Sequence, residues 1–431
     1  MSWIETYRSK IIEPEAAVSK VMSGNRVYIG CGAGVPQVLV NALVDRHEEL
    51  ENVELVHMLH FGDAPYVDPK YAGSFRHNAV FIGANVRKAI QEGRADLTPI
   101  FLGEIPYLLR SGRLPVDFAF VQLSPPDEHG FCSFGVEIGS TKPAAESAKV
   151  VIAEINERCP RTLGDSFIHV RDIDYIVETD YYLPEAPQGG ASPVHGKIGE
   201  IIAELIPNGA TLQMGIGSIP DAVLANLHGH RDLGIHTELF SDGVVELVEE
   251  GIINGSRKTL HPGKVIAGFL FGSQRLYEFV DNNAAVEMHP TDYVNDPYII
   301  SQNDNMFSIN SAIEVDLTGQ VAADSIGTRF YSGVGGQMDF VRGASRSRGG
   351  RPIIALPATA KGGELSRIVP TLKDGSGVTT TRNDGATIVT EYGVADLFGK
   401  TIRQRVRMLI DIAAPQFREE LERKAREFHY L

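Results

Sequence analysis

The sequence has few cysteines, no long apolar run and no signal-like N-terminus. Its three cysteines form no Cys-x-x-Cys pair, which suits a reducing cytosol better than a disulfide scaffold. No apolar stretch reaches the roughly 18 residues needed to span a membrane. The N-terminal segment also lacks the apolar region of a signal peptide. We therefore expect a cytoplasmic protein without a membrane partner.

The sequence also lacks an excess of positive charge. Its formal net charge is −15, the wrong sign for a protein that binds nucleic-acid phosphates, so no nucleic-acid partner is expected. This balance does not exclude a small anionic ligand, because one local site can be positive on an acidic protein.

Several catalytic motifs are missing. No Gly-x-Ser-x-Gly occurs, which excludes the nucleophile elbow of α/β-hydrolases, and no P-loop motif occurs. His57 and His60 are three positions apart on an expected strand, so their side chains should point to opposite faces. No cysteine, histidine and carboxylate cluster has the spacing of metal ligands, and no metal site is expected.

A chain of 431 residues is longer than a single hydrophobic core usually accommodates, so two domains are expected. Proline, glycine and alanine cluster in "LPEAPQGGASPVHGK" (183–197), which we interpret as the linker. The predicted domains are therefore residues 1–185 and residues 195–431.

The two halves resemble each other. "GNRVYIGCGAGVPQVLVNAL" (24–43) and "GATLQMGIGSIPDAVLANL" (209–227) share an apolar run, a Gly-x-Gly turn, a proline and a helical pattern. Their glycines match in pairs, Gly24 with Gly209, Gly30 with Gly215, and Gly32 with Gly217. Each half continues into a second short strand, and placing these strands together puts His57 roughly where Glu238 lies. A repeat of this length indicates duplicated domains.

The strands predict the fold class. Residues 118–123, 149–155, 264–271 and 351–357 are nearly continuous apolar runs, as in parallel strands covered on both faces. We expect an α/β protein of two similar, duplicated domains with mostly parallel sheets.

The turn Gly215-Ile216-Gly217 is the first candidate site. It precedes a helix with Pro220 in its first turn, and a helix N-terminus can hold an anion or an oxyanion. The simpler explanation is a tight turn that needs small residues. A dinucleotide site is a further alternative, with Glu238 as the acidic residue, but the third glycine of that motif is missing.

Glu238 is the second candidate. In "GIHTELF" (234–240) it shares a face with His236 and Phe240, near the end of the strand where α/β sheets place ligands. A carboxylate held there without water can act as a covalent nucleophile. A glutamate at the rim, or one paired with an arginine, is the alternative.

The third candidate is "YSGVGGQMDFVRGASRS" (331–347). Gly333-x-Gly335-Gly336 opens a helical segment and offers backbone N–H groups in a concave loop. A flexible turn without a ligand explains the same pattern.

Taken together and in order, five stretches resemble the acetyl-CoA hydrolase/transferase family, especially its CoA-transferases for 4-hydroxybutyrate and butyrate. They are "QMGIGSIPDAV" (213–223), "GIHTELFSDGVVELVEEG" (234–251), "NSAIEVDLTGQV" (310–321), "GVGGQMDF" (333–340) and "VTEYGVADLFG" (389–399). The resemblance implies two similar α/β domains with the active site at their interface. It also implies that Glu238 is the catalytic residue.

The resemblance further implies a ping-pong transfer through a glutamyl-CoA thioester, with CoA as a substrate and no tightly bound cofactor. The partners would be an acyl-CoA and short-chain carboxylates such as acetate, and a homodimer is expected. Gln213 is a weaker candidate for orienting the carboxylate. The implied oxyanion and CoA contacts are Gly215, Ile216, Gly217, Ser218, Ile219, Ile313, Gly335 and Gly336.

Three alternatives to a CoA-transferase stay open at this point. Water could replace the acceptor acid, which would make the protein an acyl-CoA hydrolase, and the sequence does not separate these two activities. A dinucleotide-binding oxidoreductase and a CoA-binding regulator without turnover are the others. The acyl group is equally open, because the candidate acids differ by small groups.

Overall fold

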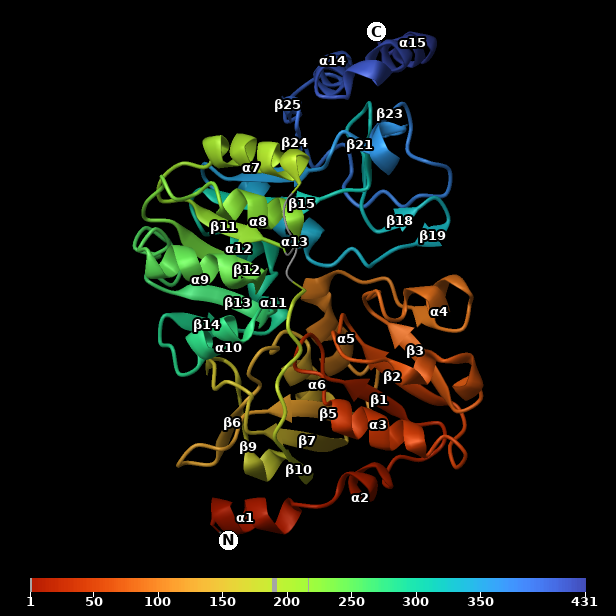
Figure 1. Ribbon diagram of the computed structural model, residues 1–431, viewed down its shortest axis with the longest axis vertical. Coiled ribbons are helices and arrows are strands. Elements are labelled where there is room, and N and C mark those ends of the chain that lie inside the picture. Colours follow the sequence, from red (N-terminus) through yellow and green to blue (C-terminus); the bar gives the residue numbers. More distant parts are fainter. Residues whose placement is uncertain (1, 188–191, 216) are drawn as a thin grey trace. The chain divides into compact units, whose positions relative to one another are not determined.

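The computed structural model describes residues 2–187, 192–215 and 217–431. By their contacts, the residues form two compact units, each continuous in space but not in sequence (Figure 1). The first contains residues 1–187 and 266–294, and the second contains residues 188–265 and 295–431.

The first unit is built on a sheet of seven parallel strands. Its strands are, in spatial order, β10 (Tyr175–Thr179), β7 (Val150–Asn156), β5 (Phe118–Leu123), β1 (Arg26–Ile29), β2 (Val53–His57), β3 (Phe75–Ala79) and β4 (Asp96–Leu97). Every residue of β5 is buried, as its apolar sequence predicts for a strand covered on both faces.

Helices cover this sheet and alternate with its strands. Helix α3 (Gln37–Asp45) packs Leu39 and Leu43 into a core shared with Phe120. The other helices of residues 1–187 are α1 (Trp3–Lys10), α2 (Pro14–Val18), α4 (Arg87–Gln91), α5 (Ile105–Arg110) and α6 (Thr141–Ser147). A two-stranded antiparallel ribbon joins β6 (Phe131–Ser133) and β9 (Phe167–His169).

Residues 266–294 also belong to the first unit. They contain most of β13 (Val265–Leu270), α10 (Gln274–Val280), β14 (Val286–Met288) and α11 (Thr291–Val294). Strand β14 pairs in parallel with β8 (Leu163–Gly164), and the rings of Phe61 and Phe271 stack with centroids 3.5 Å apart.

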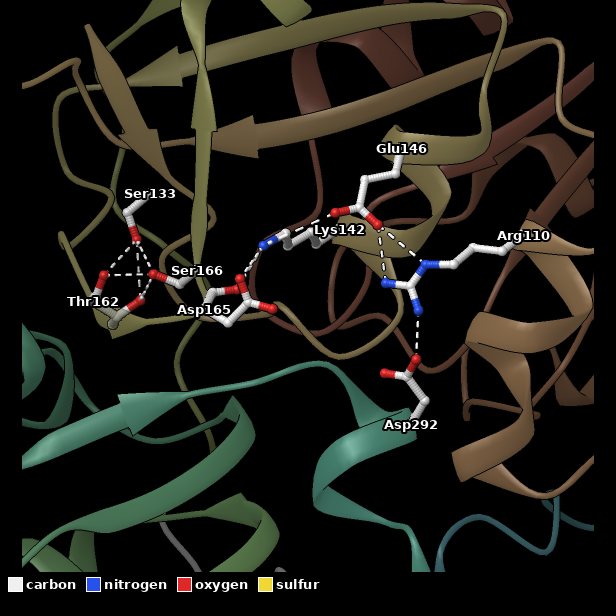
Figure 2. A network of polar contacts seen from close by, with 8 residues as sticks. All are labelled: Arg110, Ser133, Lys142, Glu146, Thr162, Asp165, Ser166 and Asp292. Carbon is white, nitrogen blue, oxygen red and sulfur yellow. Dashed lines mark hydrogen bonds and ion pairs between the residues drawn. The ribbon is translucent and has the colours of Figure 1, made fainter. Parts of the chain in front are cut away.

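Ion pairs add to these contacts. Figure 2 shows the Arg110 guanidinium between the carboxylates of Glu146, 2.9 Å away, and Asp292 on α11. Lys142 pairs with Glu146 and Asp165. Most of these side chains are partly exposed, so packing contributes more than ion pairs to holding residues 266–294 against the rest of the first unit.

The second unit repeats the parallel arrangement. Six of its strands pair in the order β25 (Gly393–Asp396), β24 (Thr387–Thr390), β20 (Arg351–Ala355), β15 (Met306–Ser311), β11 (Thr211–Met214) and β12 (Gly234–Phe240). All neighbouring pairs are parallel except β24 with β25. The α/β class with mostly parallel sheets is therefore confirmed.

Seven helices are described in the second unit: α7 (Pro193–Leu205), α8 (Ser218–Leu224), α9 (Asp242–Glu249), α12 (Pro297–Ser301), α13 (Gln337–Arg346), α14 (Ile402–Asp411) and α15 (Arg418–Glu427). Short strands complete it: β16 (Glu314–Asp316), β17 (Val321–Ala322), β18 (Ser325–Ile326), β19 (Arg329–Phe330), β21 (Thr359–Ala360), β22 (Leu365–Ser366) and β23 (Ile368–Val369). Across the described chain, every helix is too short or too polar to span a bilayer.

The backbone supports the internal repeat. Gly24 and Gly209 both have φ of 80°, and Gly32 and Gly217 also have positive φ. In each unit the first strand of the repeat lies between the second strand and one later in the sequence, β1 between β2 and β5, and β11 between β12 and β15.

The strand register corrects one detail of this repeat. Arg26 pairs with Glu54, and Thr211, the residue equivalent to Arg26, pairs with Gly234. Counting along both strands from these pairs puts Met58, not His57, at the place of Glu238. The predicted match of His57 with Glu238 is therefore wrong by one residue, because it did not include the register of hydrogen bonding between the strands. The carboxylate is still present in only one copy.

The prediction that His57 and His60 face apart was also wrong. Strand β2 ends at His57, so the alternation of the strand does not extend to His60, and the two rings lie 4.3 Å apart. Both are buried and hydrogen-bond the Tyr66 hydroxyl, His57 at 2.6 Å and His60 at 2.8 Å. His77 stacks on His57 with ring centroids 4.1 Å apart.

Candidate active site

Glu238 lies near the carboxyl end of β12, as the alternation of "GIHTELF" predicts. It is the only residue of this strand that is not fully buried, and the strand ends two residues later. Ser241 then serves as the N-cap position of α9. The side chain therefore projects from a rigid strand at the sheet edge where parallel α/β folds place their ligands.

Two donors hold the Glu238 carboxylate. The Asn295 side chain donates from Nδ2 to Oε2 at 3.0 Å, and the backbone N–H of Gly336 donates to the same carboxylate. Burial raises the pKa of Glu238 above its ordinary value, while these two hydrogen bonds lower it. The site is thus poorly hydrated, and the ionised carboxylate depends on the two donors.

Asn295 is fully buried and connects two carboxylates. Its Nδ2 lies 3.0 Å from Glu238 and 3.4 Å from Asp339 Oδ2 on α13, which fixes the donor end of the amide toward the acids. Its Oδ1 is buried and accepts no hydrogen bond within the described part of the chain. Asn295 was not predicted from the sequence, because a lone asparagine before Asp296 and Pro297 carries no recognisable pattern.

Gly336 must be glycine because of its surroundings. A Cβ at this position would lie 1.8 Å from Glu238 Oε2 and 2.2 Å from Asn295 Nδ2, far inside contact distance. Its φ of −93° is open to any residue, so the requirement is space for the carboxylate. The Gly336 N–H donates to Glu238 in this structure, and its predicted role toward an oxyanion stays a prediction.

Gly335 precedes it with φ of 60°, in the left-handed region that favours glycine. Together, the two glycines form the turn that begins α13 at Gln337. The structure therefore brings the turn at 335–336 together with Glu238, as the sequence suggested.

The other glycine turn follows β11, the neighbour of β12. Gly215 comes directly after the strand, Gly217 has φ of 116°, and Ser218 begins α8 with Pro220 in its first turn. Ile219 is buried below the turn, whereas Ile216, predicted as an oxyanion donor, lies outside the described residues.

Gln213 and Ile313 occupy different surroundings. The Gln213 amide is buried and exchanges hydrogen bonds with the Asn310 amide at 3.1 and 3.3 Å. No hydrogen bond joins it to Glu238 among the residues described, so its orienting role stays a prediction. Ile313 lies between β15 and β16, and its N–H bonds the Ala322 carbonyl at 2.8 Å.

This geometry defines a class of protein. A carboxylate near a strand end that accepts hydrogen bonds from a buried amide and from an adjacent glycine turn suits an α/β enzyme that acts on an acyl group.

Comparison with known proteins narrows the class. Residues 1–184 match the acetyl-CoA hydrolase/transferase N-terminal domain, and residues 272–425 match the C-terminal domain. The 4-hydroxybutyrate coenzyme A transferase of Clostridium kluyveri is 54% identical over 421 residues, which cover 98% of each chain.

Solved structures agree with this match. A 4-hydroxybutyrate CoA-transferase from Porphyromonas gingivalis is 44% identical and superposes with a TM-score of 0.86 over 99% of this chain and 100% of that one. RipA from Yersinia pestis is 36% identical, with a TM-score of 0.95 over all of both chains. The chain belongs to the acetyl-CoA hydrolase/transferase family, and the predicted enzyme class, a CoA-transferase, is confirmed.

Proposed function

We propose that this enzyme moves CoA between a short-chain acyl-CoA and a carboxylic acid, with Glu238 as the covalent nucleophile. The observation that carries the proposal is the desolvated Glu238 carboxylate, held by Asn295 and the Gly336 N–H. The acyl groups proposed are 4-hydroxybutyryl, butyryl and acetyl. The names of the relatives, which include a butyryl-CoA:acetate CoA-transferase, support this range.

The transfer proceeds in balanced steps. A Glu238 oxygen attacks the thioester carbonyl, the C–S bond breaks, and an acyl-glutamyl anhydride and CoA thiolate result. The thiolate then attacks the glutamyl carbonyl carbon, the C–O bond of the anhydride breaks, and the first acid leaves as its carboxylate. A second carboxylate reverses both steps on the glutamyl-CoA thioester. No net proton, metal or redox step is required.

Each step passes through a tetrahedral oxyanion that needs donors. The Gly336 N–H already donates to the Glu238 carboxylate, so it is placed to follow the oxygen that becomes negative. Gly335 and the turn of Ile216 and Gly217 are the other proposed donors. One such donor lowers the activation barrier by about 3 to 4 kcal/mol.

Coenzyme A is proposed to lie along the glycine turn that follows β11. Gly217, Ser218 and Ile219 line a cavity of about 220 Å³, which supports this placement. The remaining proposed contacts are Gly215, Ile216, Ile313 and Gly336. We also propose a homodimer in the cytoplasm, which light scattering and cell fractionation test.

The decisive experiment is to trap the intermediate. Incubation with butyryl-CoA and no acceptor acid should add the mass of CoA, less one water, to the peptide that contains Glu238. E238A should abolish the adduct and the transfer, whereas E246A, at an exposed glutamate on α9, should retain both. An active E238A enzyme, or wild type without an adduct at this peptide, would overturn the proposal.

A hydrolase would use water in place of the second acid. Loss of acyl-CoA is therefore compared with and without acetate. A transferase should consume butyryl-CoA beyond the first turnover only when acetate is present, and butyrate release at an equal rate without acetate would identify a hydrolase.

A further inference from the structure

The cavity beside the glycine turn has an arginine, Arg367, in its lining, and this side chain indicates which kind of ligand the cavity binds. It is lined by residues at the carboxyl ends of β15 and β20, by the turn 217–220 and by Arg367, and its volume is about 220 Å³. No aspartate or glutamate is among the described residues that line it. On a chain of net charge −15, this cavity is a local site that favours an anion.

Arg367 is half-buried and has little to neutralise it. In the described chain, its guanidinium makes one long hydrogen bond, from Nη1 to the Ala312 carbonyl at 3.4 Å, and no ion pair. Glu391, a carboxylate that interacts electrostatically with Arg367, uses its Oε2 to accept the Ala358 N–H at 2.8 Å. A partly desolvated guanidinium with several free N–H donors is costly unless an anion binds there.

The other polar groups of the cavity also suit an anion. Ser218 and Ser311 bring hydroxyl groups, and His195 lies in the first turn of α7, a helix of 13 residues whose positive end adds to the field of Arg367. Guanidinium groups recognise phosphate oxygens through two parallel N–H bonds.

The position of the cavity favours a CoA phosphate over the carboxylate of the substrate acid as its ligand. The reacting carboxylate has to lie against Glu238, yet Glu238, Asn295 and Gly336 are not among the residues that line the cavity. The cavity adjoins the turn proposed to hold CoA, so the part of CoA that continues from the turn into it is a part that does not react.

We propose that Arg367 binds a phosphate group of coenzyme A in this cavity. The inference rests on the proposed CoA-transferase function. It adds a residue that recognises the nucleotide end of CoA and leaves the chemistry at Glu238 unchanged.

The test compares thioesters with and without phosphate. R367A should raise the KM for butyryl-CoA about 10- to 100-fold, which corresponds to the loss of one charge-assisted hydrogen bond, and should change kcat little. For S-butyryl-pantetheine, which has no phosphate, wild type and R367A should have the same kcat/KM. R367K keeps the charge but not the planar fork, so its KM should be intermediate. R403A, at an exposed arginine on α14, should match wild type with both substrates.

Three results would overturn the inference: an equal KM increase for both thioesters, no increase for either, or an increase confined to the acceptor acid. The last would assign Arg367 to the substrate carboxylate. Calorimetric binding of CoA and pantetheine to wild type and R367A gives a readout without turnover. A wild-type protein that binds CoA through Arg367 yet transfers none would refute the proposed function and leave this inference intact.

Discussion

The backbone N–H of Gly336 reaches the Glu238 carboxylate because its α-carbon bears no side chain. G336A places a methyl group where Oε2 and the Asn295 amide now lie, so the carboxylate has to move by more than 1 Å. We expect kcat to fall about 100-fold, as displacements of this size cost in pre-organised sites. Steady-state kinetics measure it, and G229A, at a glycine with open space around it, should retain full activity.

Asn295 donates a hydrogen bond that lowers the pKa of Glu238, the proposed nucleophile. The proposed transfer requires ionised Glu238, so activity should fall as the pH drops through its pKa, which burial raises above the ordinary value. N295A removes a donor that lowers this pKa. The acid limb of the kcat/KM profile should therefore shift to higher pH.

A pH profile of N295A tests this role. We expect kcat/KM at neutral pH to fall about 10- to 100-fold, equivalent to one hydrogen bond to a charged group. N226A serves as the control, because Asn226 is exposed and its side-chain amide donates to the Ala222 carbonyl at 2.8 Å. An acid limb at the same pH in N295A and wild type would show that the amide does not tune Glu238.

At the residue scale, the sequence predicted the glycines and Glu238 but not Asn295. Gly335 and Gly336 are recognisable because adjacent glycines before a helical pattern indicate a special backbone. Asn295 is 57 positions from Glu238, and their contact depends on how β12 and the start of α12 come together. No local pattern records such a contact.

At the element scale, three buried histidines without charge lie together, His57 at the end of β2, His60 just after it and His77 on β3. His57 Nδ1 donates to the Met58 carbonyl, so its Nε2 accepts from the Tyr66 hydroxyl, and the Tyr66 oxygen then accepts from His60 Nε2. His60 Nδ1 accepts the Gly62 N–H, which completes a neutral network. Burial lowers all three pKa values, to about 3 for His60 and about 4 for His77.

This cluster should destabilise the fold in acid. The unfolded histidines bind protons below their ordinary pKa of about 6.5, whereas the folded ones do not until much lower pH. The free energy of unfolding should therefore decrease as the pH falls from about 6.5 toward 4, each histidine contributing up to about 1.4 kcal/mol per pH unit.

Urea unfolding of wild type and H77F between pH 7 and 5 measures this contribution. H77F keeps the ring stacked on His57 and removes one titrating group, so its unfolding free energy should depend less steeply on pH. H129F, at an exposed histidine, should keep the wild-type slope. Identical slopes for H77F and wild type would contradict the assignment.

A capping box begins α14. The Thr401 hydroxyl accepts the Gln404 N–H at 3.3 Å, and the Gln404 side chain accepts the Thr401 N–H at 2.9 Å. T401A should lower the free energy of unfolding by about 1 kcal/mol, measured by urea denaturation. T371A, at an exposed threonine outside any helix, should change it by less than about 0.5 kcal/mol.

The elements themselves were predictable, whereas their pairing was not. The apolar run at 118–123 located β5 to the residue, because strands covered on both faces need continuous apolar sequence, and the strand predicted at 234–240 from the match between the two halves has the bounds of β12. The match of Glu238 with Met58 depends on hydrogen-bond register, and a shift by one residue changes which face a side chain occupies.

At the scale of the whole molecule, the first unit is completed by residues from later in the chain. The family's N-terminal domain matches residues 1–184, but this unit also contains residues 266–294. Glu137 bridges to Phe269, and Phe61 stacks on Phe271. The sequence predicted a linker at 183–197, part of which lies outside the described residues, but gave no sign of this return, because contacts between distant segments leave no composition signal.

A fragment of residues 1–187 should therefore not fold as this unit does in the full chain. Without β14 and α11, the fragment leaves β8 without its parallel partner strand, and Arg110 keeps Glu146 but loses Asp292, one of its two carboxylate partners. We expect weak near-ultraviolet circular dichroism and poor protection from hydrogen exchange relative to the intact protein. A fragment with native-like protection in β1 and β5 would show that residues 266–294 are dispensable.

The lack of space at Gly336 has a consequence for protein engineering. A saturation library at this position should return only glycine when selected for CoA transfer at the wild-type rate, because even the methyl group of alanine collides with the Glu238 carboxylate. Libraries aimed at new acyl groups are better spent on side chains that do not contact Glu238 or Asn295. Such a division lets a designer change which acid is accepted while the reacting carboxylate keeps its geometry.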